Sequence, residues 1–154
     1  MNTEVALLCE SSSQDCGTDF ENTKVQYLAQ SYALAQSQGL RGNIWYEFTG
    51  GWRNSGLINS NLTEKPGFTA YTFSRSMLLD SQFSQESTDY PGVKVFVYDR
   101  GSFYLWVVWS QDGNQHTVNL PGVPQAAYDT MGTTLAQSQT VNVGVSPIYL
   151  TWPK

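Results

Sequence analysis

A carboxylate and an indole stand at equivalent places in the first third of the sequence. Glu4 opens the run 4–8, which has the pattern of a strand end entering a loop, and Trp45 lies in the apolar run 42–48. A carboxylate can attack or stabilise an oxocarbenium-like centre, while an aromatic ring stacks on the apolar face of a sugar. Glu4 and Trp45 together therefore predict chemistry on a glycosidic bond.

Further candidate side chains follow Trp45 along the chain. Glu47 is two residues on in the same expected strand, so we expect its side chain on the same side as Trp45. Trp52 and Arg53 lie in the long polar loop 49–65. Each of these residues also has an ordinary interpretation, either as a solvated surface residue or as part of the core.

Strand and helix patterns alternate before residue 80. A capping box at 18–21 and apolar residues at helical spacing predict a helix that ends at Gly39. The strand 42–48 and a loop come next, and Pro66 suits the first turn of a second helix. Two consecutive strand-to-helix units are typical of a (β/α)₈ barrel, in which ligands meet the loops that follow the strands.

After residue 80 only strand patterns occur. Apolar residues recur with a period of two over 93–98 and 103–109. Further short strands are expected at 115–120, 125–129, 140–145 and 148–152. Strands this short and regularly spaced predict a small antiparallel sandwich. The sequence thus predicts an α+β chain, with a partial (β/α) barrel segment containing two helices over 1–80 and an antiparallel β-sandwich domain over 81–154.

Composition narrows the class of partner. Charged residues make up 14% of the 154 residues, against about 25% in an average soluble domain. The net charge is −5 and the eight basic residues are scattered, which argues against nucleic acid, because binding to it needs clustered cations. No stretch approaches the roughly 18 apolar residues that a membrane span needs. A neutral, polar surface of this kind is common in extracellular proteins that act on carbohydrates.

The two cysteines bear on the compartment. Cys9 and Cys16 flank a Ser-rich stretch, and their spacing fits a disulfide that closes a small loop. Free buried thiols and a metal site are the alternatives, although His116, the single histidine, is far away in the sequence. A disulfide would indicate an oxidising compartment and a secreted protein. No signal peptide precedes the fold, so we expect that a leader has been removed or that the chain begins inside a longer protein.

The order and spacing of several motifs resemble a known group of enzymes. The motifs are Thr3-Glu4-Val5, Gly42-Asn43-Ile44-Trp45-Tyr46, the loop segment 51–58, Lys65-Pro66-Gly67-Phe68, the strand 104–110 and Ser146-Pro147-Ile148-Tyr149. In this order they look like the last two βα units and the closing sandwich of retaining barrel glycosidases, the large clan that includes cellulases and xylosidases. The resemblance covers nearly the whole chain.

The resemblance implies a role for each candidate residue. Glu4 matches the nucleophile at the end of the seventh barrel strand, and Trp45 matches the stacking tryptophan at the end of the eighth. Trp52 and Arg53 would lie on the rim of the cleft, and Glu47 is a further candidate for contact with substrate. The implied activity is retaining hydrolysis of β-linked glycans, with an oligo- or polysaccharide as partner and without a metal or cofactor.

One departure from the family is large. The acid/base glutamate of the family follows an asparagine, and no Asn-Glu pair occurs in this sequence. We therefore expect a glycosidase fragment that is inactive alone. The alternative is a non-catalytic carbohydrate-binding or accessory sandwich, using Trp52 and Trp106, and a third option is a purely structural sandwich. Because two βα units leave strand edges unpaired, we expect the first segment to pack on its own sandwich or to pair with a second copy.

Overall fold

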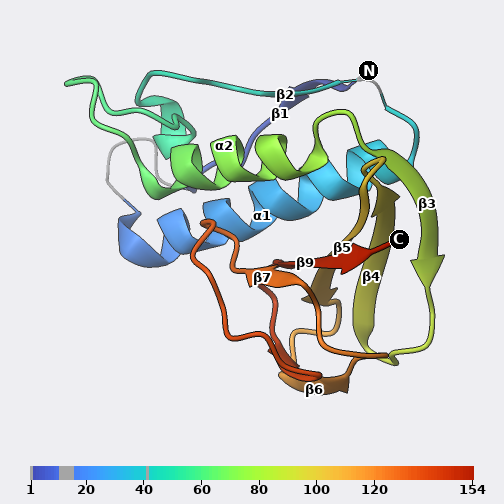
Figure 1. Cartoon of the computed structure of the whole chain (residues 1–154). Helices are drawn as coiled ribbons and strands as arrows, with labels where there is room; N and C mark the ends of the chain where they lie inside the picture. The colour runs from blue at the N-terminus through green and yellow to red at the C-terminus, as the bar shows by residue number, and fades with distance from the viewer. Residues whose placement is uncertain (1, 11–15, 41) are drawn as a thin grey trace.

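The structure, a computed structural model, describes residues 2–10, 16–40 and 42–154 (Figure 1). In chain order its elements are β1 (Asn2–Val5), α1 (Gly17–Ser37), β2 (Asn43–Trp45), the 3-10 turn η1 (Trp52–Asn54), α2 (Pro66–Leu78), β3 (Gln82–Ser87), β4 (Val93–Asp99), β5 (Phe103–Ser110), β6 (His116–Asn119), β7 (Ala126–Tyr128), β8 (Thr140–Val143) and β9 (Ile148–Pro153). Two helices and mostly antiparallel sheets make this an α+β fold, as the sequence predicted.

The elements form four layers, which Figure 1 shows from top to bottom. The parallel pair β1–β2 lies on one side of the two helices. A five-stranded antiparallel sheet of order β3-β4-β5-β9-β7 lies on the other side, and the antiparallel pair β6–β8 closes the sandwich below it. The helices are therefore covered by strands on both sides.

The central strands of the large sheet are apolar on both faces. In β4, Val95 and Val97 pack toward β6–β8, whereas Phe96 and Tyr98 belong to the cluster that packs against the helices. Successive side chains of a strand point to opposite faces, so a sheet covered on both sides needs an apolar residue at nearly every position. This requirement explains why the run 93–98 is almost continuously apolar.

The first segment packs on its own sandwich, one of the two arrangements expected. Ala33 of α1 and Leu78 of α2 share a buried cluster with Tyr149 of β9. Two buried hydrogen bonds fix this contact: the Tyr98 hydroxyl donates to the Ala33 carbonyl at 2.6 Å, and the hydroxyls of Ser74 and Tyr149 lie 2.8 Å apart. The division into 1–80 and 81–154 as separate folding units stays a prediction.

The ends of α1 differ in how well the sequence foretold them. Gly39 has φ 71° and its neighbour Leu40 donates back to Ala35 at 3.0 Å, so the left-handed helix end is found as predicted. The start is different: α1 begins at Gly17, with no side-chain hydrogen bond at its cap. Glu21 does not reach back to the cap because its carboxylate pairs with Lys24 and Lys65.

Two strands also differ from the expectation. The predicted strand 42–48 is regular only over β2, since its partner β1 ends at Val5 and offers no longer ladder. β3 carries no apolar alternation and was not predicted from the sequence. It forms because its backbone pairs with β4 along the edge of the sheet, while most of its side chains stay exposed.

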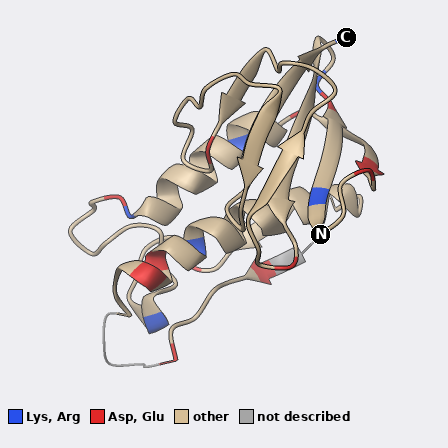
Figure 2. Cartoon of the chain, turned by 90° about the horizontal axis from the view of Figure 1, so that it is seen from below, with Lys and Arg blue, Asp and Glu red and all other residues tan. Residues whose placement is uncertain are grey.

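Among the residues that the structure describes, Lys and Arg are scattered over several elements (Figure 2). Within the residues that the structure describes, neither helix combines the length and the apolar run that crossing a bilayer would require.

Candidate functional site

The carboxyl ends of β1 and β2 lie at the same end of the molecule, where both helices begin (Figure 1). The two strands pair in parallel with Val5 opposite Trp45, and the Tyr46 amide still donates to the Val5 carbonyl at 2.7 Å. Loops after parallel strands meet at one edge of a sheet, which is where (β/α) enzymes build their sites. The candidate site is therefore assembled from these two loops.

The two faces of β1–β2 have different surroundings. Val5 and Trp45 share a buried cluster with Leu28 of α1 and with Leu57. Trp45 is 7% exposed, and its indole N–H donates to the Ser55 carbonyl at 2.9 Å. This face is turned toward the helices and is part of the core.

The opposite face carries the predicted nucleophile. Glu4 and Ile44 are exposed, and each immediately precedes a buried residue of its strand. Alternation places Ile44 on the face of β2 turned away from the helices. The register of β1 is irregular between Asn2 and Val5, so Glu4 is assigned to the same face because its side chain is exposed whereas that of Val5 is buried. The open face of β1–β2, defined by Glu4, Ile44 and the following Tyr46, is the surface available to a ligand.

The structure does not place Glu4 and Trp45 in one hollow, contrary to the expectation. Val5 and Trp45 are buried together against the helices, whereas the side chain of Glu4 is exposed. Successive residues of a strand face opposite sides, so choosing Trp45 instead of its neighbour Tyr46 as the surface aromatic is an error of one position. Tyr46, which the sequence analysis did not select as a site residue, is 41% exposed and lies just beyond the end of β2.

Tyr46 and Trp52 form an exposed aromatic pair. Their ring centroids are 5.9 Å apart and the rings meet edge to face. Trp52 is 52% exposed, so its ring remains free to contact a ligand in addition to Tyr46. Sequence alternation alone would have pointed to Tyr46, because it lies two residues after Ile44.

Glu47 forms a hydrogen bond with the backbone of Trp52. Its Oε1 accepts a hydrogen bond from the Trp52 amide at 3.3 Å, and the residue is half-buried. Gly50 lies against the same carboxylate with φ 136°, and a Cβ there would overlap the Glu47 carboxylate oxygens. Only glycine fits this position, so the loop is shaped around Glu47.

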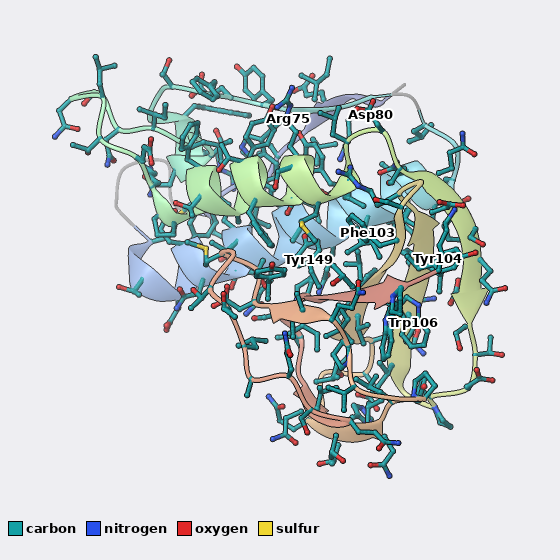
Figure 3. All side chains as sticks on the ribbon, in the orientation of Figure 1. Arg75, Asp80, Phe103, Tyr104, Trp106 and Tyr149 are labelled. Atoms are coloured by element: carbon teal, nitrogen blue, oxygen red, sulfur yellow. A yellow bond between two sulfur atoms is a disulfide. The ribbon has the colours of Figure 1, made fainter. Side chains whose placement is uncertain are left out.

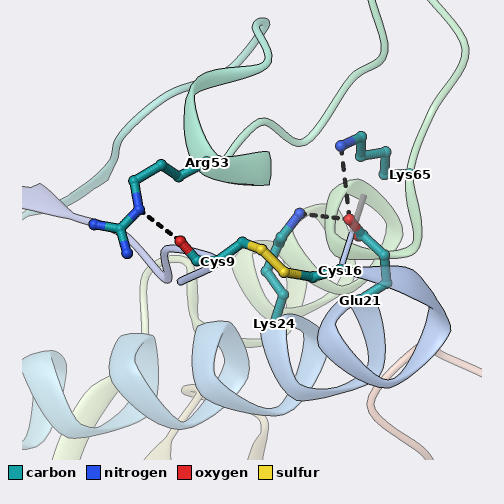
Figure 4. The surroundings of a disulfide bond; sticks show 6 residues. All are labelled: Cys9, Cys16, Glu21, Lys24, Arg53 and Lys65. Atoms are coloured by element: carbon teal, nitrogen blue, oxygen red, sulfur yellow. Dashed lines mark hydrogen bonds and ion pairs between the residues drawn. A yellow bond between two sulfur atoms is a disulfide. The ribbon is translucent and has the colours of Figure 1, made fainter. Parts of the chain in front are cut away.

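Arg53 joins the two loops of the site (Figure 4). Its Nε donates to the Cys9 carbonyl, and the Cys9 amide donates to the Arg53 carbonyl at 2.8 Å. Arg53 has φ 49° and Asn54 φ 57°, a left-handed conformation that residues other than glycine seldom adopt. Cys9 is in turn joined to Cys16 by a disulfide, with their Cα atoms 6.1 Å apart. The loop after β1 is thus fixed at both sides.

A buried lysine ties α1 to the loop after β2. Lys24 is fully buried, and its ammonium donates to Glu21 Oε1 at 2.8 Å and to the Gly56 carbonyl at 3.1 Å. Lys65 approaches the same Glu21 oxygen at 3.6 Å, as Figure 4 shows. The sequence analysis did not single out this cluster, because a lysine inside a helical stripe looks like a solvated residue.

The aromatic residues of the sandwich are engaged with one another. Trp106 is half-buried, with its ring 5.0 Å from Trp152 and 6.5 Å from Tyr90 between centroids, and Figure 3 shows its place on the sheet. Trp109 faces the helices and is buried. Trp106 is therefore partly covered by its neighbours, and its part in an accessory sugar-binding surface stays a prediction.

A further group of titratable side chains lies around the turn after β5. The His116 imidazole, the Asn114 amide and the Ser110 hydroxyl all bond the Asp112 carboxylate, which holds its pKa well below the usual range. Among the described residues, no group of three or more His, Cys, Asp or Glu side chains is placed to hold a metal ion.

Comparisons with known proteins identify solved structures that have a similar fold. No protein-family model matches the chain, and a search of the curated proteins finds no match. Among solved structures, a family 39 glycoside hydrolase from Bacteroides cellulosilyticus superimposes with a TM-score of 0.75 at 22% identity, covering 99% of this chain and 33% of that one.

Two further solved structures are similar. A family 30 endoxylanase from Clostridium papyrosolvens gives a TM-score of 0.61 at 12% identity, over 99% of this chain and 41% of that one. A conserved exported protein from Bacteroides fragilis gives 0.71 at 9% identity, over 97% and 38%. This chain spans between a third and about two fifths of these proteins. Its fold is that of the part of the family 39 and family 30 glycoside hydrolases that it covers, in agreement with the resemblance seen in the sequence.

Proposed function

We propose that this chain is part of a secreted glycoside hydrolase that cleaves β-linked glycans with retention of configuration. The observation that carries the proposal is the open face of β1–β2, where an exposed carboxylate and an exposed aromatic pair lie at the carboxyl ends of parallel strands. The fold shared with family 39 and family 30 glycoside hydrolases supports it.

Each side chain has a role in this proposal. Glu4 is the nucleophile that attacks the anomeric carbon, and the rings of Tyr46 and Trp52 stack on the sugar next to it. Glu47 and Arg53 act indirectly, because one holds the Trp52 amide and the other bonds the Cys9 carbonyl. Trp45 supports the surface from the core instead of touching the ligand.

Retaining hydrolysis needs a second carboxyl group about 5–5.5 Å from the nucleophile, to protonate the leaving group. Glu47 is occupied with the backbone of Trp52, and the family's Asn-Glu pair is missing from this sequence. We therefore propose that the chain binds glycans but does not turn them over by itself.

Ligand binding tests the aromatic pair. Titration with cello- and xylo-oligosaccharides, followed by calorimetry, is expected to show binding that Tyr46→Ala and Trp52→Ala each weaken by about fivefold, since a stacked ring contributes roughly 1 kcal/mol. Leu79→Ala is the matched control, because Leu79 is a similarly exposed apolar side chain at the far end of α2. Equal affinities for all four proteins would contradict the proposed site.

An activity assay tests the missing proton donor. Incubation of this chain with aryl glycosides is expected to release no phenol. Steady turnover that Glu4→Gln abolishes would show that these residues already contain both carboxyl groups, and the proposal of an incomplete site would then be wrong.

A further inference from the structure

A polar groove lies beside the rim of the candidate site, between the first turns of α1 and α2. Its volume is about 460 Å³, in the range of pockets that hold small ligands. The residues that carry its chemistry are two carboxylates, three amides and an ammonium group: Glu21, Glu64, Asn22, Asn54, Asn59 and Lys65. None of the described residues that line the groove is aromatic.

The charges of the groove nearly cancel. Glu21 is paired with both Lys24 and Lys65, so Glu64 is the one carboxylate of the groove outside that ion-pair cluster among the described residues. A surface with little net charge does not select a polyanion, and one whose only apolar side chain is Pro66 among the described residues does not select an acyl chain. Amides, carboxylates and an ammonium offer donors and acceptors together, which matches a neutral ligand rich in hydroxyl groups.

One carboxylate oxygen of Glu21, a residue that lines the groove, has no hydrogen-bond donor among the described residues. Oε1 of Glu21 receives both lysines, whereas Oε2 is buried and has no hydrogen-bond partner within the described part of the chain. A buried carboxylate oxygen without a partner is unfavourable, and a ligand hydroxyl can donate to it once the Glu21 side chain turns Oε2 toward the groove.

The groove continues the aromatic pair. The turn η1 places Trp52 beside Tyr46 and, two residues later, Asn54 in the groove wall. The Asn54 amide donates to Gly51 at 3.2 Å and the Ser55 amide to Trp52 at 3.1 Å, so both ends of the turn are held in place. A glycan stacked on Trp52 can therefore extend along the turn into the groove.

We propose that this groove binds the hydroxyl groups of sugar units beyond those stacked on Tyr46 and Trp52. The ligand is then an oligosaccharide chain and not a single sugar or a disaccharide. This inference rests on the proposed function, because it takes the aromatic pair as the first contact. It adds a substrate class, a neutral glycan several units long, and a second set of contact residues.

Chain-length dependence tests the groove. The probes are xylobiose with xylohexaose, and cellobiose with cellohexaose, titrated into the ¹⁵N-labelled chain. In at least one series the hexamer is expected to bind about tenfold or more tightly than the dimer, since each added hydrogen bond contributes a factor of a few. The side-chain amide signals of Asn22 and Asn59 are expected to shift with the hexamer and not with the dimer.

Substitutions locate the effect. Glu64→Gln and Asn22→Ala, both at exposed positions, are each expected to weaken hexamer binding about three- to tenfold and to leave dimer binding unchanged. Asp80→Asn removes the same charge as Glu64→Gln at an exposed position at the other end of α2, and it is expected to change neither affinity (Figure 3).

The outcomes separate the two proposals. If dimer and hexamer bind equally well and Trp52→Ala weakens both, the groove is not a sugar site while the proposed function stands. If neither length binds in either series, the proposed function and the groove are both wrong. Hexamer binding that is stronger but insensitive to Glu64→Gln and Asn22→Ala also overturns the groove.

Discussion

Trp45 and Tyr46 are adjacent in the chain and have opposite environments. The indole of Trp45 bonds the Ser55 carbonyl inside the core, while the ring of Tyr46 meets Trp52 at the surface. The same contrast separates Val5 from Glu4 on the neighbouring strand. At the scale of single residues, the candidate site is therefore decided by which face each side chain takes at the carboxyl ends of β1 and β2.

The buried tyrosines predict how stability depends on pH. Burial raises the pKa of Tyr149 and of Tyr98 above their ordinary value, and it raises the pKa of Tyr32 to about 12. The folded state therefore keeps these protons at a pH where the unfolded chain loses them. The stability that these tyrosines contribute is fully present below the unfolded pKa of about 10 and is lost as the pH rises above it. Urea denaturation at about pH 7 and about pH 11 is expected to show this loss.

Tyr149→Phe is the matched variant for that measurement. It removes one titrating hydroxyl and leaves the buried Ser74 hydroxyl without its partner, so the free energy of unfolding at neutral pH is expected to fall by about 1–3 kcal/mol. Its further loss at alkaline pH is expected to be smaller than in the wild-type chain. An identical alkaline loss in both proteins would show that Tyr149 does not contribute to it.

The loop between β1 and α1 is held by covalent and polar contacts together. The Cys9–Cys16 disulfide closes it, and the Cys9 backbone exchanges hydrogen bonds with Arg53 of η1. The cluster of Glu21, Lys24 and Lys65 adds a second connection between α1 and the loop after β2. At the scale of elements, the site is thus a pair of loops joined to each other.

Removing the disulfide is expected to destabilise the chain. Closing a loop of this length contributes about 2–3 kcal/mol in the chain-entropy model, so the double variant Cys9→Ser/Cys16→Ser should have a lower urea midpoint. Adding a reductant to the wild-type chain should reproduce this shift, and adding it to the double variant should change nothing. Unchanged midpoints throughout would mean that the polar contacts with Arg53 suffice to hold the loop.

In the whole molecule, the two helices lie between layers of strands, whereas one face of the β1–β2 pair is exposed. The helices are enclosed by strands on both sides, yet the open face of β1–β2 exposes Ile44 and Tyr46, and Phe48 and Trp52 are exposed close by. Parallel sheets are normally covered on both faces, and exposed apolar patches are sites of association. The surface that would bind sugar is thus also the surface most prone to contact another polypeptide.

Self-association through this face is therefore expected at high concentration. Light scattering should show an average mass that rises with concentration, and Ile44→Lys should suppress the rise because a charge cannot be buried there without a partner. Leu79→Lys, at a similarly exposed position on the far end of α2, is the control and should behave as wild type. A monomer mass at every concentration would contradict this expectation.

Much of the fold follows from local patterns. Pro66 and Gly39 mark a helix start and a helix end that the structure contains, and the period-two runs became β4 and β5. Such signals are carried by residues close together in the chain, so they can be recognised without knowing the fold. The edge strand β3 has no such signal, because its partner β4 and not its own side chains makes it a strand.

The candidate site required the tertiary structure. The sequence by itself determined that two strands are each followed by a helix. It also determined that Glu4 lies at the end of the first strand and aromatic residues at the end of the second. Only the pairing of Val5 with Trp45, forty residues apart in the chain, decided that the indole faces the helices and that Tyr46 faces outward with Trp52. Register is a long-range property, since it depends on how two distant strands align, and a single residue of shift exchanges core for surface.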